Sequence, residues 1–215
     1  MKELLILGSG GFAREVVWLV ERINKINMTW NILGYVDEDA ELHGKIINSY
    51  RVLGADKCIA NYPDAYVVCA IGSSKLRKKI VEKVKQQCPQ IKFASLVDPK
   101  VEISDRVTLG EGVVICANSV VTVNIDIGSH VIINLDCTVG HDAILHDYVT
   151  VNPSVNISGN VEIEEGVELG TGTQIIQGKR IGANSVIGAG SVVVRDIVGN
   201  CTAVGIPAKP IKFFD

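Results

Sequence analysis

Residues 181–192 read Ile-Gly-Ala-Asn-Ser-Val-Ile-Gly-Ala-Gly-Ser-Val, and this stretch contains one six-residue unit twice in direct succession. The period extends outward in both directions, because every sixth residue from Val97 to Val193 is Val, Ile or Leu. The positions four residues further on are small or aliphatic as far as Ile197, apart from Lys179. An unbroken six-residue period is typical of a parallel β-helix built from hexapeptides.

Each six-residue row predicts a short strand followed by a corner, and three rows make one triangular coil of roughly 18 residues. The aliphatic residue that begins a row points inward, so stacked coils bury a continuous column of such side chains. Successive coils then lie about 4.8 Å apart, which is the ordinary spacing of β-strands. A β-sandwich is disfavoured, because it would show a period of two and turns at intervals of about 8–12 residues.

The first part of the chain has a different pattern, in which strands and helices alternate. Residues 2–7 predict a buried strand, and the loop Gly8-Ser9-Gly10-Gly11 leads into an amphipathic helix that begins at Phe12. Further strands are predicted at 32–36, 64–72 and 91–97, with a second helix between Ser73 and Pro89. We therefore expect a Rossmann-like α/β domain at residues 1–96 and a β-helix with a C-terminal tail at residues 97–215.

The glycine loop is the first candidate binding site. A strand, a glycine loop and a helix in this order offer a phosphate the free backbone N–H groups at the start of the helix. The loop lacks the full G-x-G-x-x-G spacing, since position 13 is Ala, so a purely structural glycine turn fits the sequence as well. Asp37 and Glu38 end the next strand at the same edge of the sheet, and Asp37 can accept hydrogen bonds from a ribose or a uracil N–H.

Charge and cysteine content limit the classes of function. The net charge of −3 and the pI near 5.8 give no reason to expect binding to nucleic acid or to an anionic membrane surface. The six cysteines show no CxxC or other metal-like spacing, which favours a reducing cytoplasm over a disulfide framework. Because no apolar run has the length of a signal-peptide core or a membrane span, we expect a soluble cytoplasmic protein.

Within the repeats, residues 139–143 (Val-Gly-His-Asp-Ala) place a histidine next to an aspartate. His141 is expected near a corner with its side chain outward, where it can act as a general base with Asp142 orienting its ring. A solvated surface histidine explains the same dipeptide. One coil further on, Gly159 brings a backbone N–H about one strand spacing from the imidazole, and such a donor can bind an oxyanion. A glycine kept for the geometry of its corner is the alternative.

Together these patterns resemble the hexapeptide-repeat acyltransferases, in particular the bacterial enzymes that acetylate nucleotide-linked amino sugars or sialic acid. The unit at 181–192 matches that family's repeat, and Asn134 followed by Gly140-His141-Asp142 matches its catalytic row. Residues 70–80 and the ending at 205–210 are further matching blocks. The group includes the N-acetyltransferases of UDP-linked 4-amino sugars on the way to bacillosamine, the perosamine N-acetyltransferases and the sialic acid O-acetyltransferases.

The resemblance implies a left-handed coil, a first domain that holds the nucleotide of the sugar substrate, and acetyl-CoA as co-substrate. It implies that His141 acts as the base, with Asp142 as its partner, and that the acceptor attacks the thioester directly. The residues that it implies for acetyl-CoA are Gly159, Thr171, Ala189, Arg195 and Lys209. Those expected to bind the sugar substrate are Gly8, Ser9, Gly10, Gly11, Asp37, Glu38, Gly72, Ser73 and Asn134.

A zinc site is the main competing interpretation. His146 follows His141 with a spacing that also occurs in the hexapeptide-fold γ-class carbonic anhydrases, which bind zinc through histidines. The remaining histidines, His43 and His130, do not stand at an obvious position for the third ligand that a catalytic zinc needs. We therefore expect no metal. A zinc lyase and a non-catalytic nucleotide-sugar-binding scaffold are the alternatives from other classes of function.

The resemblance thus implies an acetyl-CoA-dependent acetyltransferase in bacterial surface glycan biosynthesis. Its substrate is expected to be a UDP-linked sugar rather than free sialic acid, because the glycine loop is suited to a phosphate. The sequence leaves open which sugar is acetylated and whether nitrogen or oxygen is the acceptor. A homotrimer is expected from the resemblance and from the apolar second positions of four rows, which cannot all face the interior: Val114, Val120, Ile132 and Ile144.

Overall fold

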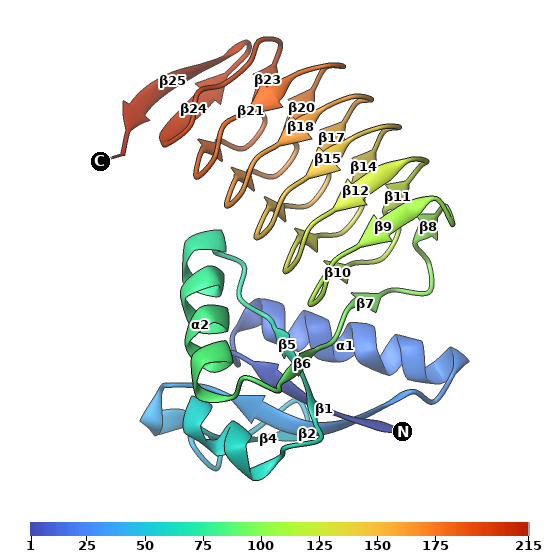
Figure 1. Cartoon of the computed structure of the whole chain (residues 1–215), viewed down its shortest axis with the longest axis vertical. Coiled ribbons are helices and arrows are strands. Elements are labelled where there is room, and N and C mark those ends of the chain that lie inside the picture. Colours follow the sequence, from blue (N-terminus) through green and yellow to red (C-terminus); the bar gives the residue numbers. More distant parts are fainter. Residues whose placement is uncertain (215) are drawn as a thin grey trace.

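The computed structural model describes residues 1–214, in which a small α/β domain lies beneath a three-sided β-helical prism (Figure 1). The α/β domain contains helices α1 (Gly11–Ile26) and α2 (Ser74–Gln87). Its sheet has the order β3-β4-β2-β1-β5-β6 and is parallel except for the β3–β4 pair. Its strands and 3₁₀ helices are β1 (Lys2–Leu7), β2 (Trp30–Val36), η1 (Ala40–Leu42), β3 (Ile46–Ile47), β4 (Tyr50–Gly54), η2 (Asp56–Asn61), β5 (Tyr66–Cys69) and β6 (Lys92–Phe93).

Two of the predicted strands differ from those observed. The strand predicted at 64–72 is limited to Tyr66–Cys69, and the one predicted at 91–97 is two separate strands. β6 completes the N-terminal sheet beside β5, whereas Leu96 already pairs with Val114 of the β-helix. The hairpin of β3 and β4 and the helix η2 were not predicted, because they lack a long apolar period. Among the residues that the structure describes, no helix has the length and apolar character needed to span a membrane.

The prism has three faces, each a sheet whose neighbouring strands come from successive coils. The first face consists of β7 (Leu96–Val97), β10 (Val114–Ile115), β13 (Ile132–Ile133), β16 (Thr150–Val151), β19 (Glu168–Leu169), β22 (Val186–Ile187), β24 (Cys201–Gly205) and β25 (Ala208–Phe213). The second face consists of β8 (Glu102–Ile103), β11 (Val120–Val121), β14 (Thr138–Val139), β17 (Asn156–Ile157), β20 (Gln174–Ile175) and β23 (Val192–Val193). The third face consists of β9 (Val107–Leu109), β12 (Ile125–Ile127), β15 (Ile144–Leu145), β18 (Glu162–Ile163) and β21 (Arg180–Ile181).

The interior of the prism holds the aliphatic residue that begins each row, as the six-residue period predicts. From Ile115 to Val193 these residues are all buried, and each such burial contributes about 1.5–3 kcal/mol to stability. The first coil is the exception, because no coil precedes it, and Leu109 there remains 37% exposed. At the other end the antiparallel strands β24 and β25 close the prism, with Cys201 and Ala203 buried in its core.

The first coils of the first face are covered by the chain's own N-terminal domain. Val114 and Ile132 pack in one cluster with residues of α1 and are 0% and 1% exposed. Two of the four apolar positions that suggested contact between copies are therefore buried within one chain, and that part of the argument for a trimer was wrong. Ile144, on the third face, remains 39% exposed.

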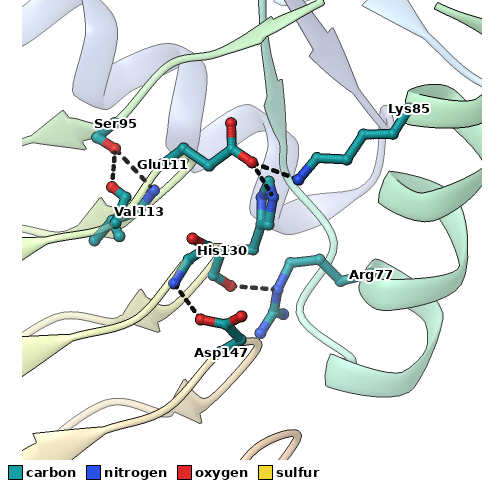
Figure 2. A network of polar contacts seen from close by, with 9 residues as sticks. Arg77, Lys85, Ser95, Glu111, Val113, His130 and Asp147 are labelled. Atoms are coloured by element: carbon teal, nitrogen blue, oxygen red, sulfur yellow. Dashed lines mark hydrogen bonds and ion pairs between the residues drawn. The ribbon is translucent and has the colours of Figure 1, made fainter. Parts of the chain in front are cut away.

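Arg77 of α2 fastens the two domains together. It is 1% exposed, and burial lowers the pKa of its guanidinium to about 10, so the group remains charged at neutral pH. Its acceptors are the carbonyl oxygens of Ile71, Gly72, His130, Tyr148 and Val149 and the hydroxyl of Thr150. Figure 2 shows Arg77 and Lys85 reaching from α2 toward the corner that carries His130. The position of α2 on the prism is thus fixed by a buried polar contact.

Candidate functional site

The edge between the second and third faces carries His141 and Asp142, which follow β14. His141 Nδ1 and Asp142 Oδ2 are 2.7 Å apart, and both side chains are about half exposed. Asn124, at the same corner of the preceding coil, donates from Nδ2 to Asp142 Oδ1 over 3.2 Å. These bonds lower the pKa of Asp142, and the bond from His141 has the larger effect. Asp142 is therefore ionised at neutral pH and holds the Nδ1 proton, which leaves Nε2 free to accept a proton.

The imidazole of His141 lies against Gly159, one coil further along the prism. A Cβ added to Gly159 would stand 2.5 Å from His141 Cε1, so only glycine fits beside the ring. The Gly159 carbonyl accepts a hydrogen bond from the Gly178 N–H, whereas its own N–H has no acceptor among residues 1–214. A donor therefore remains next to the ring, where it can bind an oxygen atom that approaches the imidazole.

The same edge of the prism continues to Arg195. Strand pairing places residues 18 apart above one another, which gives the column Val123, His141, Gly159, Gln177 and Arg195. Arg195 is exposed and lies two coils, or roughly 10 Å, beyond Gly159. The structure thus brings the candidate base and two of the acetyl-CoA candidates, Gly159 and Arg195, to a single edge.

Three other candidates lie on a different edge, between the first and second faces. Asn134 follows β13, and its Oδ1 accepts a hydrogen bond from the Leu135 N–H. Thr171 follows β19, Ala189 follows β22, and both are exposed. The whole second face separates this edge from His141. Within one chain the structure therefore does not bring these residues to the candidate base.

Two further candidates stand apart from both edges. Lys209 is exposed on β25, in the pair of strands that closes the prism. Ser73 is the residue before the first turn of α2, and its side chain makes no capping hydrogen bond. Ser73 does not line the cavity of the N-terminal domain, although its neighbour Gly72 does.

A cavity of about 630 Å³ opens at the carboxyl ends of β1, β2 and β5. The candidates that line it are Gly8, Ser9, Gly10, Gly11, Asp37, Glu38 and Gly72. Ser9 donates from Oγ to Asp37 Oδ2 over 2.6 Å, and the Asp39 N–H donates to Asp37 Oδ1. These bonds hold the Asp37 carboxylate at the glycine loop, where each of its oxygens keeps a further lone pair.

The lining residues that the sequence analysis did not predict include Asp56, Leu76, Lys79, Ile80 and Lys83. The last four have the spacing of one helix face, which was visible in the sequence. The sequence did not tell which face of α2 borders the cavity and which borders the prism. Asp56 begins η2, a short helix without a sequence signal.

An ion-pair cluster stands at the far end of the cavity. Lys83 Nζ lies 2.5 Å from Asp56 Oδ2 and 3.3 Å from Glu38 Oε1. Burial alone would raise the pKa of Asp56, but the hydrogen bond and charge of Lys83 lower it below its usual range. The Asp56 N–H also donates to Glu38 Oε1 over 3.3 Å. This end of the cavity is therefore polar and carries two carboxylate groups beside one lysine.

The remaining histidines do not form a metal site. His146 Nε2 lies 3.1 Å from Glu162 Oε1 on an exposed part of the third face. His130 is buried at the domain junction, and His43 bonds to the carbonyl of Asp37. Nowhere in residues 1–214 do three or more His, Cys, Asp or Glu side chains gather in a group that could hold a metal ion.

Comparison with known proteins covers both parts of the chain. Residues 3–84 match the family model of the PglD N-terminal domain. No match was found among curated proteins. Several solved structures resemble the chain over nearly its full length.

One of these is the H141N mutant of perosamine N-acetyltransferase from Caulobacter crescentus, in complex with CoA and GDP-perosamine. It shares 28% identity with a TM-score of 0.89, over 98% of this chain and 97% of that one. The acetyltransferase domain of PglB from Neisseria gonorrhoeae is 29% identical with a TM-score of 0.88, over 98% and 100% of the two chains, and was also solved with acetyl coenzyme A. WeeI from Acinetobacter baumannii is 28% identical with a TM-score of 0.85, over 98% and 100%.

Proposed function

We propose that this chain, which is similar over nearly its full length to solved sugar acetyltransferases, uses acetyl-CoA to acetylate the amino group of a nucleotide-linked sugar. The observation that carries the proposal is the pairing of two separate features. One is the oriented imidazole of His141 beside the free N–H of Gly159. The other is the cavity at the glycine loop.

The chemistry that we propose for His141 follows from its free Nε2. As the sugar amine attacks the carbonyl carbon of the thioester, Nε2 accepts a proton from the amine nitrogen. The negative charge on the former carbonyl oxygen is stabilised by the Gly159 N–H. When the carbon–sulfur bond breaks, the departing CoA thiolate takes the proton back from the imidazolium. Asp142 stabilises the imidazolium between these two steps.

We propose that acetyl-CoA extends along the prism from Gly159. Arg195 stands on the same edge and is suited to bind a CoA phosphate, and Lys209 on β25 is a second candidate. Thr171 and Ala189 belong to another edge, so in this proposal they contact CoA from a neighbouring copy. No covalent relay is needed. The nearby Cys137 is fully buried, and burial raises the pKa of its thiol to about 11.

The active site is proposed to form between copies of the chain, in a homotrimer. The cavity lies beside the first face, where Thr150 donates to the Gly72 carbonyl over 2.8 Å. His141 stands on the edge opposite that face, and no residue of the prism lines the cavity. In this proposal, a substrate held in the cavity of one copy gives up its proton to His141 of another copy. A closed trimer supplies that base by symmetry.

We propose UDP as the nucleotide, for the reasons already drawn from the sequence. The glycine loop and the start of α1 are suited to a diphosphate, and a single carboxylate such as that of Asp37 or Glu38 can accept the uracil N–H. The perosamine enzyme, by contrast, was solved with a GDP-linked sugar. Titration of the protein with UDP and with GDP tests the preference. Tighter binding of GDP would reverse it.

Co-expression of two inactive variants tests the shared site. Gly10→Val adds a branched side chain to a residue that lines the cavity, at a position where nothing lies within 4 Å of a Cβ, and His141→Ala removes the general base. If each site joins the cavity of one copy to the base of another, random mixing leaves about a quarter of the sites intact. Acetyl-CoA turnover by the mixture should then reach about a quarter of the wild-type rate. No recovery above the separate variants would assign both features to one chain.

A further inference from the structure

The face of α2 that lines the cavity carries two lysines in unlike surroundings. Leu76, Lys79, Ile80 and Lys83 occupy positions i, i+3, i+4 and i+7 and all border the cavity. Lys83 is held by Asp56 and Glu38, as described above. Lys79 has no carboxylate within 4.0 Å in the described part of the chain. Lys79 therefore brings an uncompensated positive charge to the cavity wall.

The opposite wall of the cavity is the glycine loop and the first turn of α1. Gly10 caps this helix without a side-chain hydrogen bond, and the first turn contains no acidic residue. The backbone N–H groups at residues 11–13 therefore have no acceptor within the helix. An anion in the middle of the cavity would face these N–H groups on one side and Lys79 on the other.

The direction of α2 gives the cavity two distinct ends. Its N-terminus is anchored on the prism, where the Ser74 N–H donates to Glu168 Oε1 over 2.6 Å and Ser74 Oγ donates to the Gly166 carbonyl. At a rise of about 1.5 Å per residue, Lys79 lies roughly 8 Å and Lys83 roughly 14 Å along the helix from Ser74. The cavity thus passes from the carboxylates around Lys83, past the free charge of Lys79, to the apolar Leu76 and the prism.

From this arrangement we infer that Lys79 binds the diphosphate of the nucleotide sugar and fixes the direction in which the substrate lies. The inference rests on the proposed function. The nucleobase of the substrate lies against Glu38 and Asp56, and the diphosphate lies between Lys79 and the start of α1. The sugar passes over Leu76 toward the prism. The reverse orientation would place the sugar against the carboxylates of Glu38 and Asp56. The acceptor amine would then point away from the prism, where acetyl-CoA is proposed to bind.

Calorimetric titration of wild-type protein and variants with UDP and with uridine tests this assignment. Lys79→Met should weaken UDP binding about 10- to 100-fold, the range expected for a lost charge-assisted hydrogen bond. It should leave uridine binding unchanged, because uridine has no phosphate. Glu38→Gln should weaken UDP and uridine binding alike, since Glu38 is proposed to contact the uracil, which both ligands contain.

Lys75→Met is the matched control. Lys75 is exposed on the same helix but does not line the cavity, so its loss removes the same charge without touching the ligand. UDP binding by Lys79→Met that equals binding by Lys75→Met would overturn the inference and leave the proposed function intact. A wild-type protein that turns over acetyl-CoA with no nucleotide sugar, and that binds neither UDP nor GDP, would instead overturn the proposed substrate.

Discussion

Acidification should destabilise this protein through His130, a buried histidine at the domain junction. Its ring is 1% exposed, stacks on Tyr148 and meets the edge of Phe93. Neither ring nitrogen has a hydrogen-bond partner in the described chain. The pKa of His130 is lowered to about 4, mainly by burial and in part by the positive charge of Lys85, while Glu111 acts in the opposite sense.

The remaining charged groups that face this ring are Arg77, which lowers its pKa, and Asp147, which raises it. In the unfolded chain His130 takes up a proton near pH 6.5, whereas in the folded protein it does so only near pH 4. The unfolded state binds more protons between these values, so stability falls as the pH falls. The loss amounts to about 2 kcal/mol per chain between pH 7 and pH 5, and about 3 kcal/mol below pH 4.

Chemical denaturation of the wild type and of His130→Phe at pH 7 and pH 5 measures this effect. Phenylalanine keeps an aromatic ring between Tyr148 and Phe93, loses no hydrogen bond and does not titrate. Between the two pH values the wild type should lose about 2 kcal/mol more than the variant. The other histidines are common to both proteins and cancel in the comparison. Equal losses in the two proteins would refute the assignment to His130.

Three further substitutions test other contacts. His141→Ala should lower kcat about 10²–10⁴-fold in an acetyl-CoA turnover assay with acetyl-CoA binding retained, and near-wild-type turnover would move the base elsewhere. Gly159→Ala should displace the imidazole, since its Cβ would stand 2.5 Å from Cε1; kcat should fall with little change in Tm, and an unchanged kcat would count against this contact. Arg77→Met should lower the unfolding free energy by at least about 2 kcal/mol in denaturation, because several buried carbonyls lose their donor.

The β-helix was predictable because its sequence period and its structural period are the same. Eighteen residues make one coil, so the contact between His141 and Gly159 follows from counting alone, and the structure has that contact. The catalytic roles of the two residues stay predictions. The period predicts that the first residue of every row is buried, and it was wrong where a coil has no preceding neighbour, as at Leu109.

The period could not tell what covers the outer side of each face. Val114 and Ile132 are apolar because α1 packs on them, but a contact with another copy would require the same residues. His130 illustrates the same limit, since it stands at a corner of the prism, where side chains usually meet solvent. Here α2 and Phe93 bury it. Contacts between domains depend on tertiary placement, which a repeat pattern does not encode.

The heights of the candidate residues along the prism fit the site that we propose between two copies. On the edge of His141, Gly159 follows one coil later and Arg195 three coils later. On the other edge, Asn134 lies in the coil of His141, Thr171 lies two coils later, and Ala189 lies in the coil of Arg195. Three coils span about 14 Å. In a trimer with its threefold axis parallel to the prism, residues at the same height on two copies lie at the same level. The candidates on the two edges follow one another in the same direction along the prism, so one edge from each copy can line a single extended ligand.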